Sequence, residues 1–520
     1  MSWLKRNSKN LMCIAFIILL ALPIIYPLLR SGFFVTDDGE WMIIRLSAFY
    51  QALADGQFPV RFLARLNHEY GYPVSTFLYP GFLYIGSMIH LLKIGFVESV
   101  KVVLGLSIIG SAVFTFFWLR RFFEKIPSLV GALSLVYAPY FLFDIYKRGS
   151  VGEVVALSIL PFILWQIQRH SLFWSSIGIG FLIISHNSLA AIFMIIITAY
   201  MLIDLYKSQE RSRQVYWYIC SIFLGLGLSA FFWLQILFEL SLTKFSDTVI
   251  SNPLEYFAGI WLIGYHAILV LLTSVLLFVL KKKSIKKHSL TVLMMGFGLV
   301  SVFLASTYSG FLWSILPVSF IQFPFRFLSV AIVSMAFLTA FAVSEFKGLS
   351  RNIFISILAI IFSISIFQQL SSIEYIDKTD GFYITNSATT TIHDEYMPVW
   401  VEKVPLSRFD EKVEIIEGGG EINNLIYNNK NIRFKVDLET DSVIQVNTIY
   451  WPGWKVYIDD KKEKISYNNP GGVMRVDAPE GKHNVQLIFG ETSVRLVSDV
   501  VSILSLGMLV MLCRKKLWKK

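Results

Sequence analysis

The sequence predicts a polytopic α-helical membrane protein of about twelve spans, with an extracytoplasmic antiparallel β-sandwich before the last span. Of its 520 residues, 55% are hydrophobic and only 16% are charged, and the mean hydropathy is +0.61. A soluble domain would carry about a quarter charged residues. Apolar runs of about 20 residues recur from Leu11 to Leu370 and again near Val497–Cys513. Between them lies a polar segment rich in turn residues.

Three regions follow from this pattern. Residues 1–370 are expected to form the transmembrane domain, with a first outer loop at 30–96. Residues 371–495 are expected to form the β-rich domain, and residues 496–520 a final span with a basic tail. The first apolar run begins at Leu11, after three basic residues, and is interpreted as a retained span because no clear cleavage site follows it.

Orientation follows from the positions of the basic residues, which favour the cytoplasmic side of a membrane. Both termini are therefore predicted to be cytoplasmic. Basic clusters occur at Lys5–Lys9, Arg120–Lys125, Arg169, Lys207–Arg213, Lys281–Lys287, Lys347–Arg351 and Arg514–Lys520. The connections predicted to lie outside are 30–75, 144–150, 237–256, 308–324 and 371–495.

The alternation of sides limits the crossings in the first hundred residues. An odd number must separate residue 30, outside, from Arg120, inside. We expect Val97–Leu119 to cross, whereas Ser75–Leu92, interrupted by Pro80-Gly81, lies along the outer leaflet. The apolar stretch 171–205 is divided at Ser185-His186-Asn187, because one helix of that length would measure about 50 Å.

The segment 371–495 alternates apolar and polar residues in short runs separated by turns. Runs such as Ile432–Leu438, Val443–Ile449 and Val485–Phe489 predict strands of a sandwich. Trp451 and Trp454 flank a Pro-Gly turn. They are interpreted as core aromatics in preference to a sugar-stacking platform.

Composition excludes some classes of function. The net charge of +10 arises from short loops that set orientation, so no nucleic-acid partner is expected. Cys13, Cys220 and Cys513 all fall inside predicted spans and form no disulfide framework.

Ionisable residues near the membrane collect at the predicted outer ends of the spans, and the midplanes are nearly free of charge. A transporter would place polar sites near the midplane. A one-sided site suits an enzyme acting on a lipid headgroup. Activating an acceptor hydroxyl requires a carboxylate, for which Asp37 and Asp38 are available. A lipid phosphate requires cations, and Arg148 and Arg326 stand in apolar contexts at span ends.

Each of these residues also has a structural interpretation. The acidic doublet could be a turn after a span, and Arg148–Glu153 could be an ion pair across a turn. His186 could be an interfacial histidine with its hydrogen bonds satisfied. Arg326 could extend its charged head to the membrane surface.

A series of loose motifs resembles the GT-C class of membrane glycosyltransferases, and more closely the bacterial membrane proteins named pyruvoyl-tetrahydropterin-synthase-related. The pterin chemistry in that name finds no support in this chain. In the same order along the chain, the motifs are Asp37-Asp38-Gly39, Ala54-Asp55-Gly56-Gln57-Phe58-Pro59-Val60-Arg61, Tyr70-Gly71-Tyr72-Pro73, Arg148-Gly149-Ser150-Val151-Gly152-Glu153, Phe323-Pro324-Phe325-Arg326, Glu395-Tyr396-Met397-Pro398 and Tyr450-Trp451-Pro452-Gly453-Trp454.

The resemblance implies a polyprenyl-phosphate sugar donor and an acidic residue of the first outer loop as catalytic base. It also implies juxtamembrane helices in that loop. Members often carry a His shortly after the acidic motif, where this chain has Trp41-Met42. His68 or His186 would then take the place of that histidine. The expected catalytic residues are Asp37 and Asp38, and the expected substrate-binding residues are Glu40, Arg61, Arg148, Glu153, His186, Arg326 and Tyr396.

These expectations favour a glycosyltransferase of inverting mechanism that moves a sugar from a polyprenyl-phosphate carrier to an envelope glycan or glycolipid. The reaction is placed at the outer face of the cell membrane. No cofactor and no dedicated metal cluster are expected, although Asp37, Asp38 and Glu40 could together bind a divalent cation. The alternatives are a lipid or polysaccharide transporter and a non-catalytic envelope assembly protein.

Overall fold

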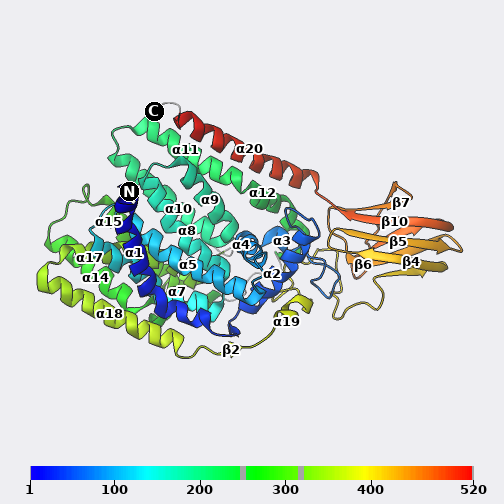
Figure 1. The fold of residues 1–520 in the computed structure, drawn as a ribbon, viewed down its shortest axis with the longest axis horizontal. Coiled ribbons are helices and arrows are strands. Elements are labelled where there is room, and N and C mark those ends of the chain that lie inside the picture. Colours follow the sequence, from blue (N-terminus) through cyan, green and yellow to red (C-terminus); the bar gives the residue numbers. More distant parts are fainter. Residues whose placement is uncertain (1, 246–252, 314, 316–320, 518–520) are drawn as a thin grey trace.

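The computed structural model describes residues 2–245, 253–313, 315 and 321–517, and it shows a helical bundle joined to a β-rich domain at one end (Figure 1). The predicted outer connections 237–256 and 308–324 lie partly outside the described residues.

The helical part runs from the N-terminus to Leu370 and is completed by the last helix of the chain. Its elements are α1 (Ser2–Ile25), η1 (Tyr26–Leu29), α2 (Gly39–Ala54), α3 (Val74–Phe77), α4 (Gly81–His90), α5 (Phe96–Leu119), α6 (Lys125–Val136), α7 (Pro139–Phe143), η2 (Asp144–Arg148), α8 (Val151–Gln168), α9 (Leu172–Ser185), α10 (Asn187–Lys207), α11 (Arg211–Leu228), α12 (Ala230–Glu239), η3 (Leu240–Leu242), η5 (Pro253–Tyr256), α13 (Ile260–Ile263), α14 (Tyr265–Leu280), α15 (Ser289–Ala305), η6 (Thr307–Ser309), α16 (Gly310–Trp313), η8 (Pro324–Phe327), α17 (Leu328–Glu345), α18 (Gly348–Leu370) and α20 (Ser493–Leu517).

Among the described residues, seven helices are long and apolar enough to cross a membrane, or ten if each of three bent helix pairs is one span. The chain is thus a multi-pass membrane protein. Two shorter apolar helices, α9 and α14, are the further elements that a count of about twelve requires. The count of twelve and the extracytoplasmic side of the β-rich domain stay predictions.

The helices are interrupted at the two places that the sequence predicts. The stretch 75–92 contains α4, whose 10 residues reach about 15 Å, half of a hydrocarbon core. It does not qualify as a span. The predicted division at His186 is confirmed, because α9 ends at Ser185 and α10 begins at Asn187.

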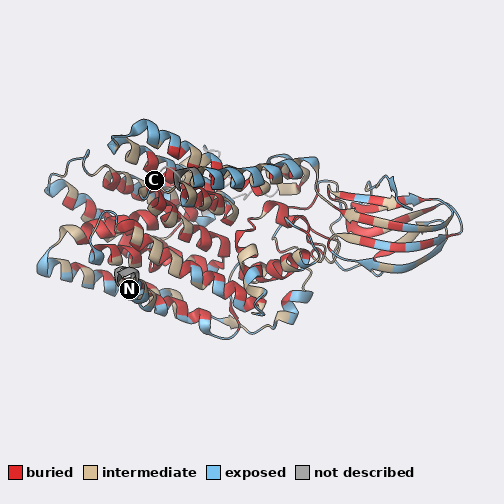
Figure 2. Cartoon of the chain, turned by 45° about the horizontal axis from the view of Figure 1, so that its top comes forward, coloured by how far each residue is buried: buried red, intermediate tan, exposed pale blue. Residues whose placement is uncertain are grey.

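Burial distinguishes central helices from those at the periphery. The apolar window at Pro324–Glu345, which contains α17, is 89% buried, whereas that of α20 is 11% buried. Figure 2 shows buried residues gathered inside the bundle and exposed ones along its outer helices. Along the interior, α5 packs against α8, and α6 packs against α17. The apolar outer faces of α18 and α20 suit contact with lipid.

The β-rich domain is a pair of antiparallel sheets, with strand orders β4-β5-β10-β7-β8 and β3-β6-β9. The three predicted runs Ile432–Leu438, Val443–Ile449 and Val485–Phe489 all lie in strands, and a C-terminal β-sheet domain is confirmed. Its strands are β3 (Val413–Glu417), β4 (Gly420–Tyr427), β5 (Asn431–Leu438), β6 (Ser442–Ile449), β7 (Trp454–Ile458), β8 (Lys461–Glu463), β9 (Val473–Ala478) and β10 (Gly481–Phe489).

Alternation of side chains builds the core of this domain. In β5, Phe434 and Val436 are buried while their neighbours along the strand are exposed, as a pleated strand with one covered face requires. Leu487 of β10 pairs in register with Ile432. Trp451 is 0% exposed and Trp454 is 4% exposed, which confirms the interpretation of both as core aromatics.

The segment between α18 and β3 connects the domain to the first loop. A two-residue strand, β2 (Tyr375–Ile376), pairs antiparallel with β1 (Phe33–Phe34). The following helix, α19 (Asp380–Thr385), packs on α2. Because α2, α3 and α4 lie between the bundle and the β-rich domain (Figure 1), residues of the first loop contact both.

Candidate functional site

The acidic loop, which carries Asp37 and Asp38 before α2, is held against the turn that precedes α8. The backbone N–H of Asp37 donates to the carbonyl of Lys147 at 2.9 Å, and that of Asp38 donates to the carbonyl of Arg148 at 2.8 Å. Two chain segments predicted to be separate outer connections are therefore joined by main-chain hydrogen bonds.

Gly149 permits this close approach. Its φ of +69° lies in the left-handed region, which favours glycine. A Cβ at this position would lie 2.6 Å from Thr36 Oγ1 and 2.7 Å from the backbone nitrogen of Gly39. The acidic loop is thus positioned by the absence of a side chain at Gly149.

Glu153 is the centre of a buried ionic cluster. Its Oε1 accepts from Arg148 Nη1 at 2.7 Å and from Arg326 Nε at 2.8 Å. Its Oε2 accepts from the Tyr140 hydroxyl at 3.2 Å. Arg148 Nη1 also donates to Asp144 Oδ1 at 2.8 Å. The Glu153 side chain is fully buried, so these charge-assisted hydrogen bonds replace water around it.

Local structure brings these groups to one level of the bundle. Glu153 lies in the first turn of α8, where the helix dipole favours a carboxylate. Arg148 is the last residue of η2, and Arg326 lies in η8 immediately before α17. Each charge therefore lies at an end of a helix, as predicted, and not midway along a span.

Aromatic rings cover the two guanidinium groups. Arg326 lies 4.8 Å from the ring centre of Phe323, and Arg148 lies 5.0 Å from that of Phe325. The motif Phe323-Pro324-Phe325-Arg326 thus supplies both a cation and the ring faces that stabilise cations.

His186 joins the cluster from the break between α9 and α10. Its Nδ1 accepts a hydrogen bond from the backbone N–H of Leu189 at 3.2 Å and so caps α10. The ring proton is then on Nε2, which faces Glu153 Oε1 at 3.4 Å. The imidazole also packs on the ring of Tyr79 at 4.6 Å.

Asp38 and Asp37 differ in their surroundings. The Asp38 carboxylate is 3.8 Å from Arg148 Nη2, and its side chain is 33% exposed. Burial raises the pKa of Asp38, and the charges of Arg148 and Arg45 oppose that rise. Asp37 is exposed. Of the two, Asp38 combines access from outside with contact to the cluster.

Arg45 belongs to the same neighbourhood and was not among the residues predicted from the sequence. Its Nη2 donates to the carbonyl of Thr390 at 2.7 Å, and its Nε donates to Thr390 Oγ1 at 3.3 Å. Burial lowers the pKa of Arg45, and the charge of Asp38 is among the influences that raise it. Asp38 directly precedes α2 and Arg45 follows it by seven positions, about two helical turns, which puts both on one side of the helix.

Tyr396 contributes a buried ring beside this region. It stacks on Phe77 with a centroid separation of 5.1 Å and on Phe245 at 5.6 Å. Its backbone N–H donates to the Tyr72 hydroxyl at 3.0 Å. Burial raises the pKa of Tyr396, so its hydroxyl stays protonated and can donate.

The structure places two predicted binding residues elsewhere. Glu40 accepts from Lys378 Nζ at 2.8 Å and from the Tyr383 hydroxyl at 3.1 Å, so it faces α19. Arg61 is buried and donates to Asp499 Oδ1 at 2.8 Å and to the carbonyl of Phe231 at 2.7 Å. Arg61 therefore fastens the first loop to the last helix, because its donors are already engaged there.

Tyr79, Tyr140 and Asp144 are the other cluster members that sequence reasoning did not select. Asp144 has a local signal, since it precedes Arg148 by four residues, the spacing of a helical ion pair. The two tyrosines have none, because tyrosine is common wherever a chain meets the membrane surface. Within the part of the chain that the structure describes, no group of three or more His, Cys, Asp or Glu residues is arranged to hold a metal ion.

Comparison with known proteins finds distant likenesses among solved structures. No family model and no curated protein matches the chain. Among solved structures, it is similar to the arabinofuranosyltransferase AftD from mycobacteria, with a TM-score of 0.46 and 14% identity over 70% of this chain. It is also similar to the oligosaccharyltransferase of Archaeoglobus fulgidus, with a TM-score of 0.42 and 12% identity over 73% of this chain. The chain spans 26% of the length of the mycobacterial protein and 57% of the archaeal one.

Proposed function

We propose that this protein is an integral-membrane glycosyltransferase. In this proposal it moves a sugar from a polyprenyl-phosphate donor to a cell-envelope glycan or glycolipid at the outer face of the cell membrane. The observation that carries the proposal is the partly exposed carboxylate of Asp38, which lies beside a buried cluster that contains Arg148 and Arg326.

Asp38 is the general base. Its raised pKa brings the carboxylate closer in basicity to the hydroxyl it must help to deprotonate, which favours proton transfer. The acceptor oxygen attacks the anomeric carbon of the donor as its proton passes to Asp38. The bond from that carbon to the phosphate oxygen breaks, and the phosphate departs with the electron pair. A single displacement of this kind inverts the anomeric centre.

Arg148 and Arg326 stabilise the departing phosphate. Nη1 of Arg148 and Nε of Arg326 are engaged by Glu153, and Nη1 of Arg326 donates to the carbonyl of Ile321 at 2.7 Å. A guanidinium has five N–H donors, so each side chain retains donors for phosphate oxygens. Glu153 holds both groups in position before the reaction, which is how fixed charges lower a barrier most effectively.

Two polar hollows lie beside the β-rich domain, and in this proposal the acceptor approaches Asp38 from their side. One has a volume of about 550 Å³ and is lined by Gln51, Arg65, Tyr427 and Asn429 among others. A second, of about 530 Å³, shares Thr385 with it and extends to Asp394. Thr390, in the same segment, binds Arg45 near Asp38. Amide, hydroxyl and aromatic groups of this kind suit a carbohydrate chain.

The test compares Asp38→Asn with Asp37→Asn in a deletion strain, at matched protein levels. Wild type and Asp37→Asn are expected to restore the envelope glycan, whereas Asp38→Asn is expected to leave it incomplete and to accumulate the lipid-linked sugar. The direct measurement is mass spectrometry of the glycan and of the polyprenyl-phosphate lipids. Full restoration by Asp38→Asn would show that the catalytic assignment is wrong.

A further inference from the structure

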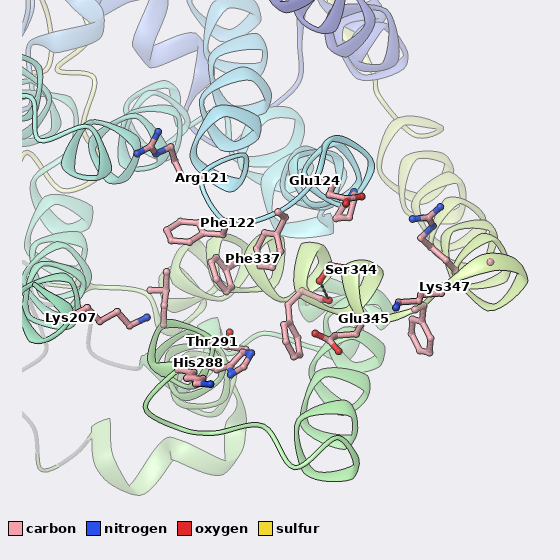
Figure 3. A pocket seen from close by; sticks show the side chains of 18 residues that line it. Arg121, Phe122, Glu124, Lys207, His288, Thr291, Phe337, Ser344, Glu345 and Lys347 are labelled. Atoms are coloured by element: carbon pink, nitrogen blue, oxygen red, sulfur yellow. Dashed lines mark hydrogen bonds between the residues drawn. The ribbon is translucent and has the colours of Figure 1, made fainter.

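A large hollow opens at the end of the helical bundle farthest from the β-rich domain. Its volume is about 820 Å³. Its walls come from the C-terminal ends of α5 and α10, the N-terminus of α15 and the connection from α17 to α18 (Figure 3). It shares no residue with the Glu153 cluster.

The rim of this hollow is strongly basic. Arg121, Lys207, Lys287, Lys347 and Arg351 all line it. These five residues belong to four separate parts of the chain, so it is the tertiary structure that brings their positive charges together.

The carboxylates of the lining do not balance this charge. They are Glu124 and Glu345, and Glu345 accepts from Lys281 at 2.9 Å and from Lys283 at 2.8 Å, neither of which lines the hollow. Arg351 Nε is buried with no hydrogen-bond partner among the described residues. An anion in the hollow would therefore meet cations whose charge is not already neutralised.

Aromatic side chains form the inner wall. Phe122, Phe337 and Phe341 line the hollow, and the rings of Phe122 and Phe337 lie 5.6 Å apart. Figure 3 shows Phe122 and Phe337 between the basic side chains of Arg121 and Lys207 on one side and Ser344 on the other. An apolar wall beneath a cationic rim matches a molecule with an anionic head and an apolar body.

We propose that this hollow binds the phosphate headgroup of an anionic phospholipid, with an acyl chain against the phenylalanines. The alternative explanation is that basic residues collect at this end of the bundle only because they set the orientation of the protein in the membrane. That explanation needs no hollow, however, and it predicts equal effects for basic residues inside and outside it. Lys125, Lys282 and Lys286 are exposed on the same end and do not line the hollow, so they provide the control.

The experiment uses the full chain in nanodiscs made of phosphatidylcholine alone or of equal parts phosphatidylcholine and phosphatidylglycerol. Native mass spectrometry counts retained phosphatidylglycerol, and thermal unfolding measures the stabilisation it confers. In the triple variant Arg121→Gln, Lys207→Gln, Arg351→Gln, binding is expected to weaken about a hundred-fold, since each basic residue near a headgroup contributes about 1 kcal/mol. The variant Lys125→Gln, Lys282→Gln, Lys286→Gln, with the same net charge, is expected to bind as wild type does.

Equal losses in the two triple variants, or no loss in either, would overturn the proposal. If the hollow variant fails to fold, Lys207→Gln alone is measured, with an expected loss of about five-fold. A separate arm adds inorganic phosphate or ATP to wild-type protein in phosphatidylcholine discs. Stabilisation there equal to that by phosphatidylglycerol would assign the hollow to a soluble phosphate and contradict the lipid assignment.

Discussion

Glu153 and Arg326 are 173 positions apart in the chain and are joined by a hydrogen bond of 2.8 Å from Nε to Oε1 inside the protein. The same carboxylate oxygen also accepts from Arg148. One buried acid thus holds two cations together, and one of them, Arg148, lies beside Asp38. The following predictions test this arrangement.

Replacing Glu153 with Gln is expected to destabilise the protein strongly. Two buried guanidinium groups would lose their shared counter-charge, and breaking a buried ion pair on one side costs about 3–5 kcal/mol. The control is Glu40→Gln, whose partner Lys378 is partly exposed, with an expected cost of about 0–1 kcal/mol. Thermal unfolding of both variants measures the difference, and equal costs would contradict the central role of Glu153.

Replacing Gly149 with Ala is expected to displace the acidic loop and to abolish most sugar transfer. The new Cβ would lie 2.6 Å from Thr36 Oγ1, closer than real contacts allow. Gly56→Ala is the matched control, because Gly56 also has a positive φ, of +83°, but no atom within 4 Å of the added Cβ. It carries the backbone strain without the collision. Activity relative to stability, compared between the two variants, separates the effects.

Sugar transfer is expected to depend on the protonation of Asp38. A general base acts only when deprotonated, so kcat/KM should fall as pH decreases through the pKa of this carboxyl. Burial raises that pKa, so the midpoint of the loss should lie above the ordinary value for aspartate, about 3.9. Asp37→Asn should keep this loss of activity at low pH, with its midpoint moved downward, because the charge of Asp37 is among the influences that raise the pKa of Asp38. Disappearance of the pH dependence in Asp37→Asn would assign the base to the other aspartate.

Arg61 and Arg326 are expected to respond differently to replacement by Lys. Arg61 lies away from the proposed site and binds Asp499 and Phe231, so Arg61→Lys should lower stability and leave the KM for the donor unchanged. Arg326→Lys removes donors that the proposal directs at phosphate and should lower kcat. Steady-state kinetics on folded, purified protein distinguishes the two. A raised donor KM in Arg61→Lys would return that residue to the binding site.

Lys412 in the β-rich domain is expected to make stability rise with pH. Burial lowers its pKa to about 7, and its ammonium donates to the carbonyls of Glu69 and Asn447. In the unfolded chain the pKa of lysine is about 10.4. Between these values the unfolded state binds more protons, so the free energy of unfolding increases with pH.

Denaturation of the whole protein from pH 7 to pH 10 measures this slope. Lys412→Met should remove it, because the titrating group is gone. The exposed Lys435, replaced by Met in the same domain, should leave the slope as it is in wild type. An unchanged slope in Lys412→Met would show that another group is responsible.

Much of the architecture can be read from local patterns. The break at His186 follows from the length limit on a span, and the strands around Phe434 follow from alternation of apolar and polar residues. Such features depend on neighbours in the chain and on the membrane thickness, which sequence reasoning can represent. The buried state of Trp451 and Trp454 followed from the same logic.

The site was only partly predictable. Ionisable residues at span ends are costly without a role, which predicts Arg148, Glu153, His186 and Arg326, and the structure brings all four together. Arg61 satisfies the same rule and lies elsewhere, since its partner Asp499 comes from the far end of the sequence. Pattern alone does not distinguish the two cases.

By itself, the sequence determined a series of apolar helices, a β-rich domain before the last of them, and ionisable residues at helix ends. Hydropathy and the alternation of apolar and polar residues depend only on neighbouring residues. They show which segments need lipid around them and which form strands with one covered face, and this defines the fold class. Only the tertiary structure decided that Asp38 faces Arg148 while Asp37 faces outward. That choice depends on the main-chain contact at Gly149 and on the burial of Glu153 among groups far apart in the sequence.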